Sequence, residues 1–379
     1  MLNTQQGLCT VEAKSAKQIK EFIYLPEQIH KNHSNWLPPI YIDERNFFNP
    51  KKNIAFSHCD TIMLLALQNG RPVGRIMGII HKTYNALHGE KTARFGFFDC
   101  YNIPEVAQLL ISEIEHWAKS KGMTRIIGPY GFSDKDPQGF LIDGFEHMPV
   151  LDSACNLPYM VDFVEQAGYT KEVDCLIYTL DIDKGLPESY NRIIQRVEAN
   201  NGFQFIEISK RSQLKQYILP ILRMVNETYS ELFGFVPMEE QEMLDFAKRY
   251  LPIVNPKFVK IATVGDKLAG FIIGLPNFTP GIQKAKGRLF PFGIFHILRA
   301  MRRTNQLDLM LGAVDKEFRG RGLEIAMAIR MINSCKEAGL DRIEIHLVLE
   351  TNTAMIAELE RANCNFHKRF RVFGKDVRC

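Results

Sequence analysis

The stretch VDKEFRGRGLEIAM, residues 314–327, says more about the fold than any other part of the chain. An apolar run leads into it and an apolar-periodic helix follows, so it predicts a strand, a short turn and a helix. Gly320 and Gly322 let the backbone of that turn approach a ligand closely. Unpaired N–H groups of a first helical turn, with the charges of Arg319 and Arg321, suit a pyrophosphate group. The alternative is an ordinary glycine-bearing turn with solvated arginines.

Two widespread phosphate motifs do not fit this turn. It is not a P-loop, because no Gly-Lys-Ser/Thr follows the glycines. It is not the dinucleotide fingerprint either, because no GxGxxG ends the first strand of a βαβ unit.

The turn resembles the cofactor signature of the GNAT superfamily of acyl-CoA-dependent N-acyltransferases. That signature is Gln/Arg-x-x-Gly-x-Gly/Ala between the fourth strand and the third helix, and it is met by Arg319, Gly320, Arg321, Gly322 and Leu323. The sixth position departs from it, because Glu324 would crowd or repel the pyrophosphate unless its side chain points away. Asn352 matches a second GNAT feature, an Asn that follows the fifth strand and opens the next helix. The resemblance implies that acyl-CoA binds in the second half, with these residues at the site.

The resemblance also implies how the donor would lie. In GNAT proteins the fourth and fifth strands splay apart, and the pantetheine arm adds to the fourth strand. Backbone groups of Gly312, Ala313 and Val314 would then hold the pantetheine and polarise the thioester carbonyl, as fixed N–H dipoles stabilise an oxyanion.

The usual acid of the family is missing from this chain. Many GNAT proteins protonate the leaving thiolate with a Tyr about seven residues after the Asn, where this chain has Leu359. Catalysis would then rest on positioning of the substrates or on another group. Glu350 and His346, near the end of the fifth strand, are candidate general bases, and the alternative is that each is an ordinary strand residue.

The order of elements around the turn is written twice in the chain. Gly74 in VGRIMGII and Gly270 in LAGFIIGL hold matching places, as do Asn156 and Asn352, with the same offset. Each half reads as a hairpin followed by strand, helix, strand, helix and strand, which indicates one architecture repeated. The first half lacks the cofactor turn, since only YNI separates the strand FGFFDC from its helix, and we expect it not to bind acyl-CoA.

These patterns predict an α+β fold of two tandem GNAT-like domains, each a mixed, mostly antiparallel sheet flanked by helices. The expected domains are residues 1–182, a degenerate copy, and 183–379, which carries the acyl-CoA site. Phrases such as WLPPIYIDE and GPYGFSDKDPQGFLIDGFE resemble a bacterial tandem-GNAT group. Aspartates in the loop 132–155 either attract a cationic amine or serve turns; they are Asp134, Asp136 and Asp143.

A basic and apolar insert, residues 278–307, interrupts the second half. It holds six Lys or Arg and no Asp or Glu, and it is rich in Phe, Leu and Ile. Such a segment suits a peripheral contact with an anionic membrane or a cover for a long acyl chain. The alternative is a helical excursion that docks on the other domain with its charges solvated.

The composition of the 379 residues is that of a globular protein with about two domains. Hydrophobic residues make up 46% and charged residues 24%, which excludes fibrous and wholly disordered classes. The net charge of +4 is too mild to indicate a nucleic-acid partner. The eight cysteines form no metal-ligand pattern, so we expect no metal site and a reducing, cytoplasmic compartment. The first twenty residues lack a signal peptide's apolar core, and no apolar run reaches the roughly 20 residues that span a bilayer.

The sequence thus predicts an acyl-CoA N-acyltransferase that acts on an amine, with acetyl-CoA as the default donor and another acyl-CoA as the variant. The acceptor is a small-molecule or lipid amine, and the oligomeric state is not indicated. One alternative is long-chain acyl transfer to a lipid amine, as in bacterial ceramide-type synthesis, supported by the insert. The other is a catalytically silent GNAT-fold binding protein, favoured by Glu324, Leu359 and the degenerate first half.

Overall fold

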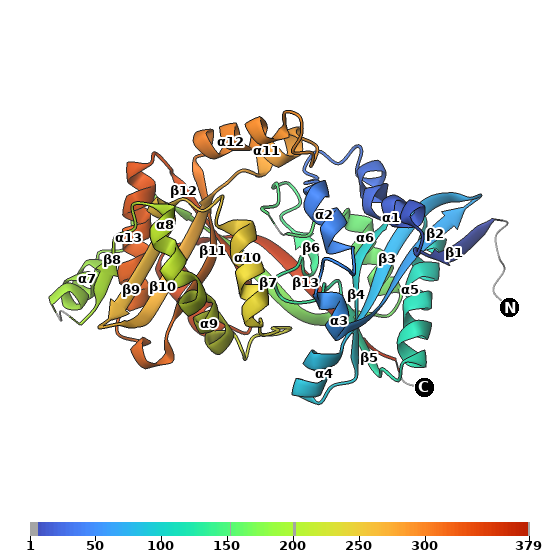
Figure 1. Ribbon diagram of the computed structural model, residues 1–379, viewed down its shortest axis with the longest axis horizontal. Helices are drawn as coiled ribbons and strands as arrows, with labels where there is room; N and C mark the ends of the chain where they lie inside the picture. Colours follow the sequence, from blue (N-terminus) through green and yellow to red (C-terminus); the bar gives the residue numbers. More distant parts are fainter. Residues whose placement is uncertain (1–6, 152, 200–201, 378–379) are drawn as a thin grey trace. The chain divides into compact units, whose positions relative to one another are not determined.

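The computed structural model describes residues 7–151, 153–199 and 202–377, and contacts divide the chain into two compact units (Figure 1). The segments of unit 1 are Met1–Cys175, Thr279–Arg299 and Lys368–Cys379. Those of unit 2 are Leu176–Phe278 and Ala300–His367. This division follows contacts rather than chain order, and the boundary expected after residue 182 stays a prediction.

Unit 1 is a mixed sheet with helices on both faces. Its strands are β1 Leu8–Glu12, β2 Cys59–Gln68, β3 Arg71–His81, β4 Thr92–Cys100, β5 Arg125–Gly128, β6 Phe140–Asp143, the start of β7 Thr170–Asp181 and most of β13 Asn365–Asp376. Its helices are α1 Ala16–Ile29, α2 Tyr41–Phe47, α3 Ala55–His58, α4 Lys82–His88, α5 Pro104–Ser120, α6 Pro158–Gln166, α11 Thr279–Lys284 and most of α12 Gly293–Arg303. The strands run in the order β1-β2-β3-β4-β5-β13, and β6 also pairs with β13.

The predicted first hairpin is confirmed as β2 and β3. Asn69 and Gly70 both have positive φ, 51° and 76°, which is the conformation that a two-residue hairpin turn of type I′ requires. The turn sets a register from Gln68↔Arg71 to Cys59↔His81. β4 then pairs with β3 antiparallel and with β5 parallel.

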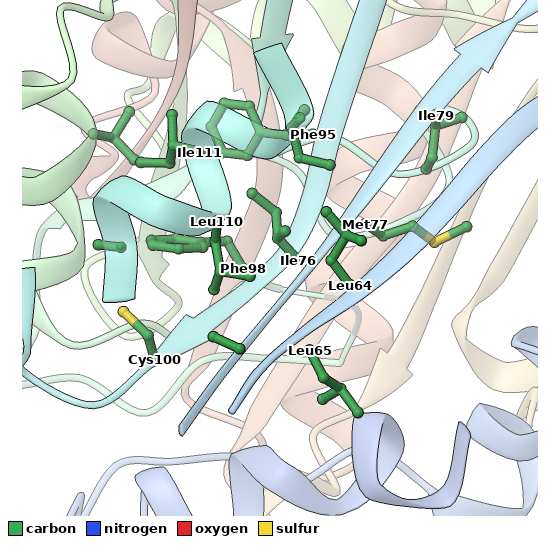
Figure 2. Packing of buried hydrophobic residues seen from close by; sticks show 14 of the residues in the cluster. Leu64, Leu65, Ile76, Met77, Ile79, Phe95, Phe98, Cys100, Leu110 and Ile111 are labelled. Carbon is green, nitrogen blue, oxygen red and sulfur yellow. The ribbon is translucent and has the colours of Figure 1, made fainter. Parts of the chain in front are cut away.

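Alternate residues of β3 face two different helices. A Cβ at Gly74 would lie 2.8 Å from side-chain atoms of Val106 and Leu110, so the glycine lets α5 pack closely on the strand. The next residue, Arg75, points to the other face, where its guanidinium donates to the Phe22 carbonyl of α1. Apolar residues of β2, β3, β4 and α5 fill the core of this unit (Figure 2).

Unit 2 repeats the arrangement. Its strands are the end of β7, then β8 Gln204–Ile206, β9 Val259–Val264, β10 Lys267–Pro276, β11 Gln306–Val314 and β12 Arg342–Leu349. Its helices are α7 Ser189–Ala199, α8 Arg211–Leu214, α9 Ile218–Thr228, α10 Glu240–Tyr250, α13 Leu323–Glu337 and α14 Thr353–Arg361. The order is β7-β12-β11-β10-β9-β8, with β11 and β12 parallel and β10 antiparallel to both of its neighbours.

The two halves correspond in packing as well as in order. A Cβ at Gly270 of β10 would lie 2.9 Å from Met327 of α13, so Gly270 does for α13 what Gly74 does for α5. The asparagine landmarks differ: Asn352 caps α14 by accepting from Met355 N, whereas the amide of Asn156 binds both backbone groups of Leu141. The fold class is therefore confirmed, while the second landmark pair matches in place but not in local role.

Several elements were not anticipated from the sequence. The helix α7 lies between β7 and β8, and a short strand, β6, lies within the loop 132–155. The insert 278–307, by contrast, contains α11 and α12, in agreement with the alternative of a helical excursion. Each cysteine in the described part of the chain is a free thiol.

Candidate functional site

The turn between β11 and α13 has the strand–turn–helix form that its sequence predicts. β11 ends at Val314, a 3₁₀ turn covers Lys316–Phe318, and α13 begins at Leu323. Gly320 and Gly322 have φ of 72° and 82°, which side-chain-bearing residues rarely adopt. Because the first turn of a helix has N–H groups without intrahelical acceptors, α13 presents donors and the positive end of its dipole here.

The two glycines meet different surroundings. A Cβ at Gly320 would have no atom within 4 Å, so this position is open. A Cβ at Gly322 would lie 2.7 Å from Ile193 Cγ2 and 3.1 Å from Val197 Cγ2, both on α7. The helix that the sequence analysis missed therefore packs against the start of α13, and Gly322 is needed for that packing.

The exposed side of the turn carries positive charge. Arg319 is exposed, and its Nε donates to the Val314 carbonyl at 3.2 Å. Arg321 is also exposed, with its guanidinium 5.5 Å from the centre of the Phe318 ring. The nearby carboxylates of Asp315 and Glu317 both bind Lys267 Nζ at 2.9 Å.

Hydrogen bonding to Lys267 lowers the pKa of Asp315, so this carboxyl stays ionised and paired. Glu324 is the acidic exception in the turn. It is half-buried at the second position of α13, where a carboxylate interacts favourably with the helix dipole. It would therefore compete with a phosphate for the same positive potential.

The strands β11 and β12 separate beside this turn. Their parallel register runs from Gln306↔Arg342 to Leu309↔Ile345 and ends there. On its other side β11 stays paired with β10 as far as Val314↔Gly270, with a bulge opposite Ile273 and Gly274. The segment that contains Gly312, Ala313 and Val314 thus has one edge facing away from β12. Such an edge can pair with an extended ligand as a sheet pairs with a strand.

Tyr229 reaches this open segment from the end of α9. Its hydroxyl donates to the Gly312 carbonyl at 2.9 Å, and its ring packs edge-on against Phe235. A phenol next to the strand is a proton donor of the kind that Leu359 cannot supply. Leu359 itself is buried in the core between α14, α13 and β12.

Two buried carboxylates lie at the point where the strands part. Asp308 of β11 and Glu344 of β12 are direct register partners, so their side chains share one face of the sheet. The Gln306 amide Nε2 lies 2.8 Å from Asp308 Oδ1 and 3.1 Å from Glu344 Oε2. Asn277 donates to Asp308, and His367 Nε2 lies 3.6 Å from Glu344 Oε2. These polar side chains gather beside the open strand edge.

The two predicted bases occupy different places. His346 is half-buried and is the first residue of β12 beyond the paired segment, two residues after Glu344. Glu350 follows the end of β12, four residues further on, which is roughly 13 Å of extended chain. His346 therefore lies where β11 and β12 separate, and Glu350 lies beyond the end of β12. Asn352, expected at the cofactor, caps α14.

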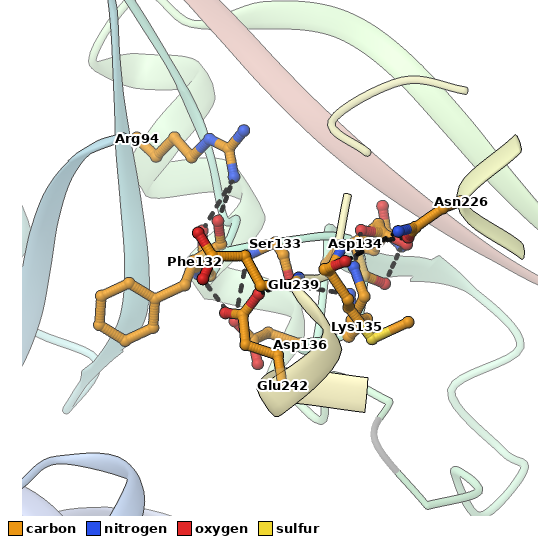
Figure 3. Close-up of polar contacts among 12 residues, drawn as sticks. Arg94, Phe132, Ser133, Asp134, Lys135, Asp136, Asn226, Glu239 and Glu242 are labelled. Carbon is orange, nitrogen blue, oxygen red and sulfur yellow. Dashed lines mark hydrogen bonds and ion pairs between the residues drawn. The ribbon is translucent and has the colours of Figure 1, made fainter. Parts of the chain in front are cut away.

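The described part of unit 1 has neither the parted strands nor the glycine-bearing turn. Its β4–β5 register ends at Arg94↔Ile127, but Tyr130 N then donates to the Phe95 carbonyl at 2.8 Å. Arg94 is buried and donates to the Phe132 carbonyl (Figure 3). It also donates to the Gly131 carbonyl, and its guanidinium lies over the rings of Tyr84 and Tyr130. The chain itself thus occupies the space where the strands would part.

The turn after β4 is equally unsuited to an anion. Asp99, next to the end of β4, accepts from Arg75 and His30. The charge of Arg75 and these hydrogen bonds hold the pKa of Asp99 at about 2 against the cost of burial. Pro104 at the start of α5 removes one N–H donor. In the following loop, Asp136 accepts from Phe132 N and Ser133 N, so it serves a turn (Figure 3).

Sequence reasoning missed Tyr229, Asp308, Glu344 and His367. A signal existed for two of them, because Asp308 and Glu344 are lone charges inside the apolar runs QLDLMLGAV and RIEIHLVL. A charge in a buried strand is costly unless it is paired, so it marks a place where polar groups gather. Tyr229 had no such signal, since its neighbour on β11 is distant in sequence.

Two known proteins are similar to the chain over nearly its whole length. No protein-family model matches the chain. It is 29% identical over 383 residues to a Caulobacter vibrioides protein named bacterial ceramide synthase, with 98% of each chain covered. It is 28% identical over 368 residues to YghO of Escherichia coli, covering 95% of this chain and 93% of that one.

Solved structures share its fold at low sequence identity. A tandem GNAT protein from the clavulanic acid biosynthesis pathway superposes with a TM-score of 0.56 and 13% identity, over 98% of this chain and 99% of that one. A GCN5-related N-acetyltransferase from Sphaerobacter thermophilus gives 0.52 and 12%, over 98% and 96%. The resemblance to the tandem GNAT fold is confirmed.

Proposed function

We propose that this tandem GNAT-fold chain is an acyl-CoA-dependent N-acyltransferase whose unit 2 binds the donor. One observation carries the proposal: β11 and β12 part after Leu309 and Ile345, and the freed edge of β11 leads directly to the helix start at Leu323. The pantetheine pairs with that edge, and the pyrophosphate meets the first-turn N–H groups of α13. Unit 1 has a filled strand gap and a proline-bearing helix start, and we do not expect it to bind the donor.

The open position at Gly320 fits the pyrophosphate, because a Cβ there would meet nothing of the protein. Arg319 and Arg321 add two exposed positive charges at the same place. The cofactor set proposed for unit 2 is the one expected from the sequence: Gly312, Ala313, Val314, Arg319, Gly320, Arg321, Gly322, Leu323, Glu324 and Asn352. Within it, Gly322 and Asn352 also have structural roles, in helix packing and capping.

The reaction joins the amine to the acyl carbon and releases the thiol. The nitrogen lone pair attacks the thioester carbonyl carbon, the carbonyl oxygen takes up negative charge, and the C–S bond then breaks. The amine loses one proton and the thiolate gains one, so no net proton is required. We propose that His346, two residues after Glu344 on β12, receives the first proton and that Tyr229 supplies the second. Glu350 remains a candidate base at the far end of β12.

We propose a long-chain acyl donor and a lipid amine acceptor in preference to acetyl transfer. The Caulobacter relative is named a ceramide synthase, and a ceramide is the amide of a fatty acid with a long-chain amine. The aromatic side chains that the insert leaves exposed fit the same substrate class. The acetyl reaction is the outcome to test against.

Thermal-shift titrations with CoA, acetyl-CoA and palmitoyl-CoA test the donor site, because a ligand that binds only the native state raises the melting temperature. We expect a shift with each, and about a tenfold to hundredfold weaker affinity for Arg319→Ala/Arg321→Ala, from lost charge-assisted hydrogen bonds. Lys17→Ala/Lys20→Ala, two exposed lysines of α1, is the matched control.

No shift with any CoA would contradict the proposal and favour a silent binding protein. If CoA binds, mass spectrometry of the amide product with a long-chain amino alcohol then compares the palmitoyl and acetyl donors. A product formed with acetyl-CoA alone would refute the long-chain assignment while leaving the donor site intact.

A further inference from the structure

The insert presents a bare aromatic surface. Phe290, Phe292 and Phe295 are 73%, 69% and 64% exposed, and Ile294 and Leu298 are exposed beside them. We call these five side chains the α12 surface. Isolated exposed apolar residues are ordinary, but a contiguous group of this kind marks an interaction site. We propose that the α12 surface docks the protein on an anionic lipid bilayer.

The segment beneath this surface is held firmly by unit 1. Gln283 Nε2 donates to the carbonyls of Ser34 and Trp36 at 2.7 and 3.1 Å. The Arg288 guanidinium binds both carboxylate oxygens of Glu27 at 2.8 Å and lies over the Tyr41 ring. These contacts fix the base of the insert, so the Phe side chains project from a rigid support.

Two close approaches rigidify the support further. A Cβ at Gly281 would lie 2.6 Å from Ile297 Cα, so α11 and α12 pack backbone to backbone. Gly287 accepts from Tyr41 N at 3.0 Å and has a φ of 69°. Within α12, Gly293 and Ile297 are buried while Phe295 and Leu298 are exposed, which gives the helix one face toward the protein and one toward the outside.

The charge of the segment selects the kind of membrane. Residues 278–307 contain no Asp or Glu. All six of its Lys and Arg residues are exposed, and Arg288 among them is paired with Glu27. The other five are Lys284, Lys286, Arg299, Arg302 and Arg303. Aromatic side chains enter the boundary between headgroups and acyl chains, and cations beside them attract anionic headgroups. A protein partner would need an apolar pocket surrounded by acidic residues to match this surface. An anionic bilayer offers apolar acyl chains and negative headgroups at every point of its surface.

The geometry also sets the mode of binding. α12 has 11 residues, and among the described residues no helix is long and apolar enough to cross a bilayer. The helix therefore lies in the plane of the interface. The inference is independent of the proposed acyl transfer, because it concerns where the protein sits and holds for a silent protein as well. If the acceptor is a lipid amine, docking delivers the protein to its substrate.

Vesicle co-sedimentation of the full chain without CoA tests the proposal. The probes are vesicles of phosphatidylcholine with about 30% phosphatidylglycerol, and of phosphatidylcholine alone. We expect binding to the anionic vesicles that falls at least tenfold when salt rises from about 0.1 to 0.5 M, as electrostatic attraction is screened. Phe290→Ser/Phe292→Ser/Phe295→Ser is expected to bind at least 100-fold more weakly.

The control is Ile54→Ser/Leu87→Ser, which removes two exposed apolar side chains elsewhere and is expected to bind like the unaltered protein. Circular dichroism checks that all variants are folded. Failure of the unaltered protein to bind anionic vesicles would overturn the proposal, as would equal binding by the triple-Phe variant. A third outcome would also overturn it: the unaltered protein is a dimer, the triple-Phe variant is a monomer, and neither binds vesicles. A second copy of the chain would then cover the surface. Acyl transfer to a water-soluble amine, assayed separately, tells failure of docking from failure of the proposed reaction.

Discussion

Gly320 and Gly322, in the turn between β11 and α13, allow the effect of a mutation on stability to be compared with its effect on the proposed CoA binding. Gly320→Ala places a Cβ in open space, so its only cost is the left-handed backbone, about 1 kcal/mol. Gly322→Ala has the same backbone cost and also forces a Cβ to 2.7 Å from Ile193 Cγ2. Overpacking of this kind costs about 1–3 kcal/mol. We therefore expect Gly322→Ala to destabilise unit 2 by about 2–4 kcal/mol.

A double-mutant cycle with Ile193→Ala isolates the contact. Removing the Ile193 side chain makes room for the new Cβ, so the two changes together should cost at least about 1 kcal/mol less than the sum of the single changes. Both tryptophans, Trp36 and Trp117, lie in unit 1. Their fluorescence follows unfolding of that unit, and hydrogen exchange of α13 amides follows unit 2.

The variant Gly320→Ala, which we expect to be the more stable of the two, is expected to have a clear loss of CoA affinity. If the pyrophosphate lies over Gly320, Gly320→Ala weakens CoA affinity at least tenfold while it leaves α13 nearly as stable as before. Equal losses of stability for the two variants, with additive behaviour in the Ile193 cycle, would refute the packing of α7 on this turn. Unchanged CoA affinity in Gly320→Ala would refute the cradle.

Three further results are expected. Glu324→Gln should raise CoA affinity about twofold to fivefold in calorimetric titration, because a carboxylate no longer competes for the helix dipole; a weaker affinity would show that Glu324 helps to bind the donor. Tyr229→Phe should lower kcat of the proposed reaction about 100-fold with little change in KM, and an unchanged kcat would exclude Tyr229 as the acid. Burial, with the charge of Arg94, lowers the pKa of His81 from 6.5 to about 4. This histidine should therefore contribute its full stabilisation above pH 6.5, and the free energy of unfolding of unit 1 should fall by about 3 kcal/mol as the pH falls to about 4. The variant His81→Asn can still cap Tyr84 N, and its free energy of unfolding should fall less over that range. Urea unfolding followed by fluorescence measures both.

Much of the fold could be predicted because its signals are local. The hairpin at Asn69 and Gly70 follows from turn chemistry, and α5 and α13 follow from apolar periodicity bounded by Pro or Gly. Gly74 and Gly270 also carried readable information, since a glycine inside a strand marks a close approach by another element. The strand, turn and helix around residues 314–327 could also be predicted, because all their parts are consecutive in sequence.

The rest depends on contacts between distant residues. Only the family resemblance implied that β11 and β12 part. The residues themselves do not show that pairing stops after Leu309, since both strands continue to read as strands beyond that point. Tyr229 meets Gly312, a residue 83 positions away, through the packing of α9. The sequence analysis assigned no element to the residues of α7, and this helix is the partner that gives Gly322 its second role.

The central proposal is that unit 2, and not unit 1, binds the acyl-CoA donor. Hydrogen exchange of the full chain with and without saturating CoA measures this directly, because a bound ligand slows exchange of the amides that it covers. The account predicts slower exchange in residues 310–324 and no change in residues 95–106, which include the corresponding turn of unit 1. Protection of residues 95–106, or exchange in 310–324 that CoA leaves unchanged, would contradict it.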